Sequence, residues 1–162
     1  MVIACARRGP AEAGGSWCEV PFPAGAAPGT VLRAGISLAA AGDMGLAARG
    51  SDPSFGRFLA TLGVDAARVR SVRQVHSRTV VEAPPGPASG GPAPGAGTST
   101  ATEADGIVTR DPGLLLTVTV ADCLPIFLVD RASGAFAVVH SGWKGTGIAG
   151  EALRLMAGLF GT

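Results

Sequence analysis

Four short apolar runs follow one another closely between residues 105 and 141, and they constrain the fold more than any other part of the chain. Most of them are apolar on both faces, which is typical of strands in a deeply buried sheet. The turn residues RAS separate the last two runs. The runs are DGIVTR (105–110), GLLLTVTVADC (113–123), PIFLVD (125–130) and GAFAVVHS (134–141).

Two other segments show helical periodicity. SDPSFGRFLATLGV (51–64) offers Ser51 or Asp52 as an N-cap and Gly63 as a helix end. GIAGEALRLMAGLF (147–160) follows the last apolar run. Apolar side chains recur at helical spacing in both segments, at Phe55, Phe58, Leu59 and Leu62 and at Ile148, Leu153, Leu155, Met156 and Leu159.

The rest of the chain is less regular. WCEVPF (17–22) is compatible with a strand, and RVRSVRQVHSRTVVEA (68–83) predicts two short strands or one bent strand around His76. Residues 83–104 are rich in Pro, Gly, Ala, Ser and Thr, a composition that predicts a disordered surface insertion. Many strands with few helices between them favour an α+β fold over repeating βαβ units.

Composition limits the class of protein. The 162 residues are 47% hydrophobic, enough for one domain, so we expect a single domain over 1–162. A net charge of +1 gives no electrostatic footprint for nucleic acid or an acidic membrane. Three cysteines without a CxxC pair argue against a disulfide scaffold. The order of charged and apolar residues at the N-terminus does not predict a signal peptide, no apolar run is long enough to predict a membrane helix, and we expect a cytoplasmic protein.

Three residues with metal-ligand chemistry, His76, Cys123 and His140, each close a strand-like run. Two imidazoles and a thiolate that converge would form a three-ligand zinc site with an open fourth position, the arrangement of catalytic zinc. Alternatives remain open: a buried apolar cysteine, hydrogen-bonded surface histidines, or a cysteine nucleophile with a histidine base. Asp122 directly precedes the cysteine.

The glycine-rich turn GWKGTG (142–147) carries Lys144, the single lysine of the chain. It lacks the Gly-Lys-Ser/Thr order of a nucleotide-binding P-loop. Its glycines either expose backbone N–H groups to an anion at the start of the next helix or simply form a tight strand-to-helix turn.

The motifs RQVHS, ADGIVTR, LTVTVADCLPIFLVD and AVVHSGWKGTGIAG resemble, in this order, the core motifs of the laccase-domain family. Members of this family are also called polyphenol oxidases, peptidoglycan editing factors and purine nucleoside phosphorylases. The resemblance runs from about residue 35 to 160. It implies a single α+β domain, a mixed β-sandwich flanked by helices in α/β/β/α layers, with His76, Cys123 and His140 as metal ligands.

The resemblance also implies an activity: phosphorolysis of adenosine, inosine, guanosine or methylthioadenosine to the base and ribose 1-phosphate, with adenosine deamination besides. The implied cofactor is Zn²⁺, with a single copper as the alternative, because two histidines are too few for a multicopper cluster. The implied partners are a purine nucleoside and phosphate. Lys144, Arg57 and Gly145 are candidates for holding phosphate, and Asp122 is a candidate either for supporting the metal ligands by hydrogen bonding or for a general base.

Two features depart from the family pattern. Gly56-Arg57 stands where relatives have an Asn-Arg pair, and relatives continue well beyond the helix at 147–160, so we expect a C-terminally short member. Two other functions therefore stay open: a catalytically silent zinc-binding domain, and a cysteine-type hydrolase that edits cell-wall peptides.

Overall fold

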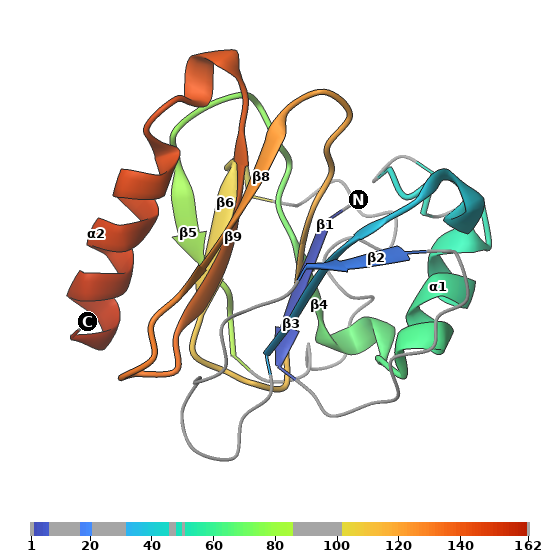
Figure 1. The fold of residues 1–162 in the computed structure, drawn as a ribbon, viewed down its shortest axis with the longest axis horizontal. Coiled ribbons are helices and arrows are strands. Elements are labelled where there is room, and N and C mark those ends of the chain that lie inside the picture. The colour runs from blue at the N-terminus through green and yellow to red at the C-terminus, as the bar shows by residue number, and fades with distance from the viewer. Residues whose placement is uncertain are drawn as a thin grey trace.

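Two mixed β-sheets packed face to face, with one helix on the outer side of each, form the computed structural model of this protein (Figure 1). The structure describes residues 2–6, 17–20, 32–45, 48–49, 51–85 and 102–161. The first sheet has the strand order β2 (Trp17–Val20), β3 (Leu32–Ser37), β1 (Val2–Ala6), β7 (Leu115–Val118) and β4 (Val69–Ser71). The second has the order β5 (Val80–Glu82), β6 (Gly106–Thr109), β9 (Phe136–Ser141) and β8 (Leu124–Val129).

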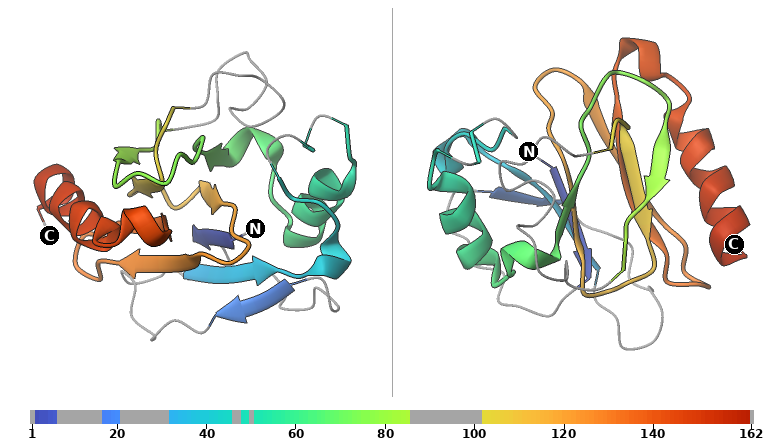
Figure 2. Two further views of the ribbon diagram at one scale, coloured as in Figure 1. Left: turned by 90° about the horizontal axis from the view of Figure 1, so that it is seen from above. Right: turned by 180° about the vertical axis from the view of Figure 1, so that it is seen from behind.

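The two long helices lie on opposite sides of the sandwich in every view (Figure 2). Helix α1 (Ser54–Leu62) covers the first sheet, and α2 (Ile148–Phe160) covers the second. Three short 3₁₀ helices complete the described elements: η1 (Ala39–Ala41), η2 (Ala66–Arg68) and η3 (Trp143–Gly145). This architecture confirms the α+β fold in α/β/β/α layers. Among the described residues, no helix is both long and apolar enough to cross a membrane.

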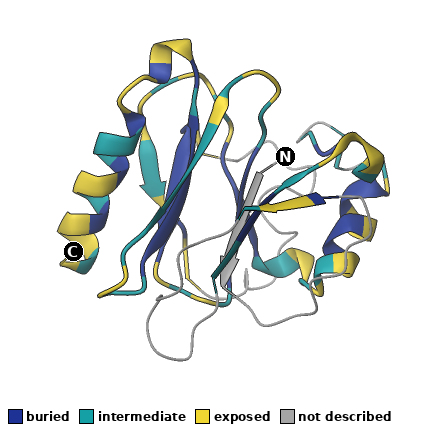
Figure 3. Ribbon diagram, viewed as in Figure 1, coloured by how far each residue is buried: buried dark blue, intermediate teal, exposed yellow. Residues whose placement is uncertain are grey.

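Alternation along the central strands divides the apolar side chains between the layers. On β9, Phe136 and Val138 face the core between the sheets, whereas Ala137 and Val139 face α2. On β7, Leu116 faces the inter-sheet core and Leu115 faces α1. The central strands β6, β7 and β9 are therefore covered on both faces, which explains why their sequences are mostly apolar (Figure 3). Each such fully buried large side chain contributes roughly 1.5–3 kcal/mol of burial free energy.

The long strand predicted for residues 113–123 is wrong in its length. Strand β7 ends at Val118, and residues 119–123 form the connection that takes the chain into the second sheet at β8. The Gln74 side chain explains the early end. It donates to the Thr119 carbonyl and accepts from the Thr119 N–H, at 2.7 Å each, and so occupies the groups that a neighbouring strand would otherwise pair.

Residues 68–83 form the two short strands of one predicted alternative, β4 and β5. They belong to different sheets, β4 pairing in parallel with β7 and β5 in parallel with β6. The segment between them, which contains His76, therefore crosses from one sheet to the other.

The predicted insertion at 83–104 is described only at its two ends, and residues 86–101 lie outside the described part of the chain. Both ends belong to the fold. Ala83 and Ala104 are buried in the core between the sheets, and Glu103 forms an isolated parallel bridge with Arg73.

The helix predicted within 51–64 is confirmed as α1, which ends at Gly63 with φ of 65°. Its start differs slightly from the prediction. Pro53 is the N-cap residue, and Asp52 supports the first turn by accepting a hydrogen bond from the Ser54 N–H at 2.7 Å.

Candidate metal centre

Three segments that connect or end strands meet at the upper end of the molecule in Figure 1, and each brings one of the predicted ligands. His76 lies in the connection from β4 to β5, and Cys123 directly precedes β8. His140 lies near the end of β9, where it pairs with Pro125. Their ligand atoms all lie within 4.8 Å of one another. The structure thus brings together residues that are far apart in the sequence.

The three side chains differ in exposure, so the site is closed on one side and open on the other. His140 is buried, Cys123 is half-buried, and His76 is exposed. The two imidazole rings meet edge to face, with centroids 4.9 Å apart and planes inclined by 82°. A ligand can therefore approach from the His76 side, while His140 is fixed by the core.

The buried carboxylate of Asp105 determines which nitrogen of His140 faces the site. Its Oδ1 lies 2.8 Å from His140 Nδ1, and its side chain is fully buried. Because a carboxylate only accepts hydrogen bonds, Nδ1 carries the proton and donates. In the neutral ring the other nitrogen, Nε2, then has a free lone pair, the form that a metal ligand requires.

Asp105 also holds the segment that carries His76. Its two oxygens accept from the main-chain N–H groups of Val75 (3.2 Å), His76 (3.0 Å) and Ser77 (2.6 Å) and from the Ser77 hydroxyl (2.8 Å). Burial raises the pKa of Asp105, but the hydrogen bonds from Ser77, His140 and Val75 outweigh burial and leave the pKa below its ordinary value. These bonds hold His76 in the left-handed backbone region, with φ of 59°, which a non-glycine residue rarely adopts.

Gly142 closes the third side of the site. A Cβ atom at this position would lie 2.8 Å from His76 Cδ2, 3.3 Å from Cys123 Sγ and 3.5 Å from His140 Cε1. Gly145 permits a similar approach, since a Cβ there would lie 2.8 Å from the Ser77 carbonyl oxygen. Both glycines of the GWKG turn thus allow main chain to pack directly against the ligand-bearing segments.

The donor set fits a metal that accepts imidazole and thiolate ligands. A tetrahedral zinc site places its nitrogen and sulfur donors about 3.5 Å apart, so side-chain movements of about 1 Å would bring the three atoms to that spacing. Without a metal, burial and the nearby Asp122 carboxylate raise the pKa of the Cys123 thiol. A cysteine nucleophile acts as its thiolate, and the cysteine-hydrolase alternative stays a prediction.

A cavity of about 390 Å³ opens beside the three residues. Asp122 is exposed at its wall, with Oδ1 3.7 Å from Cys123 Sγ, and its role as a base stays a prediction. The Cys123 thiol donates to Asp122, whereas the carboxylate that bonds the ring of a candidate histidine ligand is Asp105, which sequence reasoning missed. Its one signal was an acidic residue at the start of a buried strand, in ADGIVT. The lining residues are Arg73, Gln74, His76, Thr119, Val120, Ala121, Asp122, Cys123 and His140.

The structure does not bring the predicted phosphate ligands to this cavity. Lys144 is exposed on η3, and Arg57 is exposed on α1, where it donates to Ser54 Oγ at 3.0 Å. Neither side chain is among the residues that line the cavity. The assignment of Lys144, Arg57 and Gly145 to phosphate stays a prediction.

The fold and the site together define the class of protein. It is an α+β sandwich of two mixed sheets, with a His–Cys–His candidate metal centre at the end where the sheets are connected. Residues 52–162 match the family described as multi-copper polyphenol oxidoreductase laccase, and the chain belongs to this family. Within the described residues, one group of three potential ligands is found.

Known relatives agree with this membership. A purine nucleoside phosphorylase of Deinococcus radiodurans is 34% identical over 122 residues, which are 72% of this chain and 43% of the relative. An adenosine deaminase from an unknown prokaryotic organism is 52% identical over 42 residues, 26% of this chain and 16% of the relative. The chain therefore spans less than half the length of these relatives.

A solved structure shows the same fold. The crystal structure of a hypothetical protein of Bacillus licheniformis superposes with a TM-score of 0.60 at 28% sequence identity. The superposition covers 67% of this chain and 41% of the Bacillus protein.

Proposed function

We propose that this chain is a zinc-dependent purine nucleoside phosphorylase that converts adenosine, inosine, guanosine or methylthioadenosine to the free base and ribose 1-phosphate, and that it also deaminates adenosine. The observation that carries the proposal is the convergence of His76, Cys123 and His140 beside a cavity. The names of the Deinococcus phosphorylase and of the prokaryotic deaminase support the two reactions.

The chemistry of the reaction sets the demands on the site. In phosphorolysis a phosphate oxygen bonds to C1′ of the ribose while the C1′–N9 bond breaks. The electron pair of that bond leaves on the purine, which takes up a proton. The site must therefore hold an anion near a sugar that develops positive charge and must supply or relay a proton.

The residues around the cavity match these demands. His76, Cys123 and His140 would hold the metal, which when bound supplies Lewis acidity for polarising a substrate oxygen. Asp105 keeps the His140 proton on Nδ1 and so keeps Nε2 free for binding. The Gln74 amide fixes the connection that forms the wall at Thr119 and Val120. Asp122 is the carboxylate at the cavity wall that would relay the proton that the purine takes up.

The test is a product assay with zinc supplied. Inosine is incubated with the protein with and without phosphate, and free hypoxanthine and ribose 1-phosphate are measured; adenosine is assayed in parallel for inosine and ammonia. We expect phosphate-dependent hypoxanthine release and phosphate-independent deamination. Both should be lost in Cys123→Ala and kept in Cys18→Ala, which alters an exposed cysteine on β2. Absence of base and of deamination product from the zinc-loaded protein would refute the proposal.

A further inference from the structure

The cavity beside the candidate metal centre is lined by an arginine, Arg73. Among the described residues that line it, only Arg73 carries a side chain that is always cationic. Asp122 carries the opposite charge at the same wall. Besides a metal bound at the three candidate ligands, an anionic co-substrate that enters this cavity therefore finds Arg73 as the permanent counter-charge among the described lining residues.

The main chain at Arg73 is held in place on both sides. Its N–H donates to the Thr102 carbonyl at 3.0 Å, and its carbonyl accepts from the Ala104 N–H at 3.1 Å. Arg73 is also three residues from His76, so chain geometry limits their Cα separation to about 10 Å. The main-chain atoms that carry the Arg73 side chain are therefore held close to the candidate metal centre.

The present partner of Arg73 is easily exchanged. Its guanidinium forms an ion pair with Glu103, and the two side chains are 58% and 55% exposed. Ion pairs this exposed contribute little stability, because water solvates both groups almost as well as they solvate each other. A phosphate group can bind the planar guanidinium through two oxygens as a carboxylate can, and it carries more negative charge, so phosphate can compete with Glu103 for Arg73.

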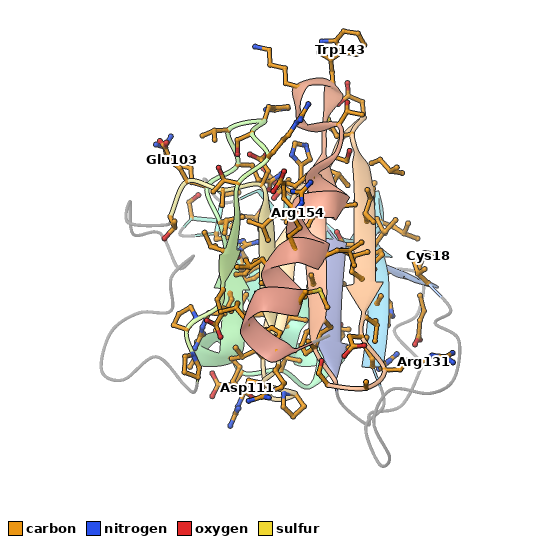
Figure 4. All side chains as sticks on the ribbon, turned by 90° about the vertical axis from the view of Figure 1, so that its left-hand side faces the viewer. Cys18, Glu103, Asp111, Arg131, Trp143 and Arg154 are labelled. Atoms are coloured by element: carbon orange, nitrogen blue, oxygen red, sulfur yellow. The ribbon has the colours of Figure 1, made fainter. Side chains whose placement is uncertain are left out.

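We propose that Arg73 binds the phosphate co-substrate, with Glu103 occupying its guanidinium until phosphate replaces it. This inference rests on the phosphorylase function proposed above. It assigns the phosphate side of the cavity to Arg73 in place of Lys144 or Arg57, which do not line it. Glu103 lies toward the end of the molecule that carries Trp143, which is the end of the candidate metal centre (Figure 4). Asp111 and Arg131 mark the opposite end.

The test measures binding and turnover separately. For binding, the melting temperature of the zinc-loaded protein is recorded with sodium phosphate and with sodium chloride of the same ionic strength, without nucleoside. For turnover, the KM for phosphate is measured with saturating inosine. The variants are Arg73→Gln, Glu103→Gln, Lys144→Gln and a matched control, Arg154→Gln. Arg154 forms a similarly exposed ion pair with Glu151 on α2, and neither residue lines the cavity.

We expect Arg73→Gln to remove the phosphate-specific rise in melting temperature and to increase the KM for phosphate by roughly tenfold or more. Glu103→Gln should lower this KM, because the guanidinium no longer has a competing carboxylate. Arg154→Gln and Lys144→Gln should behave like the unaltered protein. An unchanged phosphate response in Arg73→Gln, or a loss confined to Lys144→Gln, would overturn the inference.

The two proposals can fail independently. If the unaltered protein shows neither phosphorolysis nor deamination, the proposed function fails, while the melting experiment still reports whether Arg73 binds phosphate. If both reactions occur and Arg73→Gln keeps the KM of the unaltered protein, the function stands and the assignment of Arg73 is wrong.

Discussion

Asp105 contacts both histidine-bearing segments of the candidate metal centre, through the ring of His140 and through the main chain at His76. Such hydrogen-bonding partners orient the ligands of a metal and set their protonation state. Because one buried carboxylate serves both histidines, the two ligand positions depend on a single residue that does not itself reach the metal position.

Replacing Asp105 by Asn should therefore weaken metal binding by about 10- to 100-fold. The new amide would have one acceptor oxygen, and its NH₂ group would face main-chain N–H groups that now donate to the carboxylate. Zinc affinity can be measured by competition with a chromophoric chelator. The control is Asp65→Asn, since Asp65 caps η2 through a hydrogen bond from the Ala67 N–H, and asparagine is an equally good cap. Equal affinities in the two variants would contradict this role of Asp105.

Gly142 is needed for space and not for its backbone conformation. Its dihedral angles (φ −85°, ψ 178°) suit any residue, but the candidate ligands leave no room for a Cβ atom. The methyl group of Gly142→Ala would come within 2.8 Å of the His76 ring and should displace it, lowering zinc affinity with little effect on folding. Gly56→Ala is the matched control. It adds the same methyl group on α1, where nothing lies within 4 Å, and should stabilise the helix by about 0.5–1 kcal/mol. Zinc titration of the two variants measures the zinc affinity, and urea unfolding measures the free energy of unfolding. Tight zinc binding in Gly142→Ala would show that the glycine is not needed for the site.

The elements themselves were largely predictable from the sequence. Apolar runs and turn residues located β6, β8, β9 and α2, and a helix-breaking glycine located the end of α1. These features depend on local patterns of burial and backbone freedom, which a single sequence displays directly.

The sequence did not predict where β7 ends or that β4 and β5 belong to different sheets. Strand β7 ends where the Gln74 side chain takes over the pairing of Thr119, a contact between residues 45 positions apart. The candidate ligands were found because each closes a strand-like run in the sequence, a local signal. Asp105 and Arg73 were missed because their partners, His140 and Glu103, come close only in the folded chain.

At the scale of the whole molecule, the candidate ligands lie where the two sheets are joined. The β4–β5 connection brings His76 from the first sheet to the second, and the β7–β8 connection does the same for Cys123. His140 belongs to the second sheet alone. A bound metal would tie both connections to the second sheet at one end of the sandwich, so metal binding and global stability should be linked.

Zinc should accordingly stabilise the whole domain. A ligand that binds only the folded state at 100 times its Kd adds about 2.7 kcal/mol to the free energy of unfolding. Zinc binding by the unfolded chain would reduce this increment. Urea unfolding in buffered zinc at that concentration, compared with unfolding in excess chelator, measures the increment directly. Cys123→Ser should lose most of it, because a serine hydroxyl is a far poorer zinc ligand than a thiolate. Cys18→Ser makes the same change at an exposed position on β2 and should retain the full increment. An increment of the same size in Cys123→Ser would mean that zinc stabilises the protein from some other place.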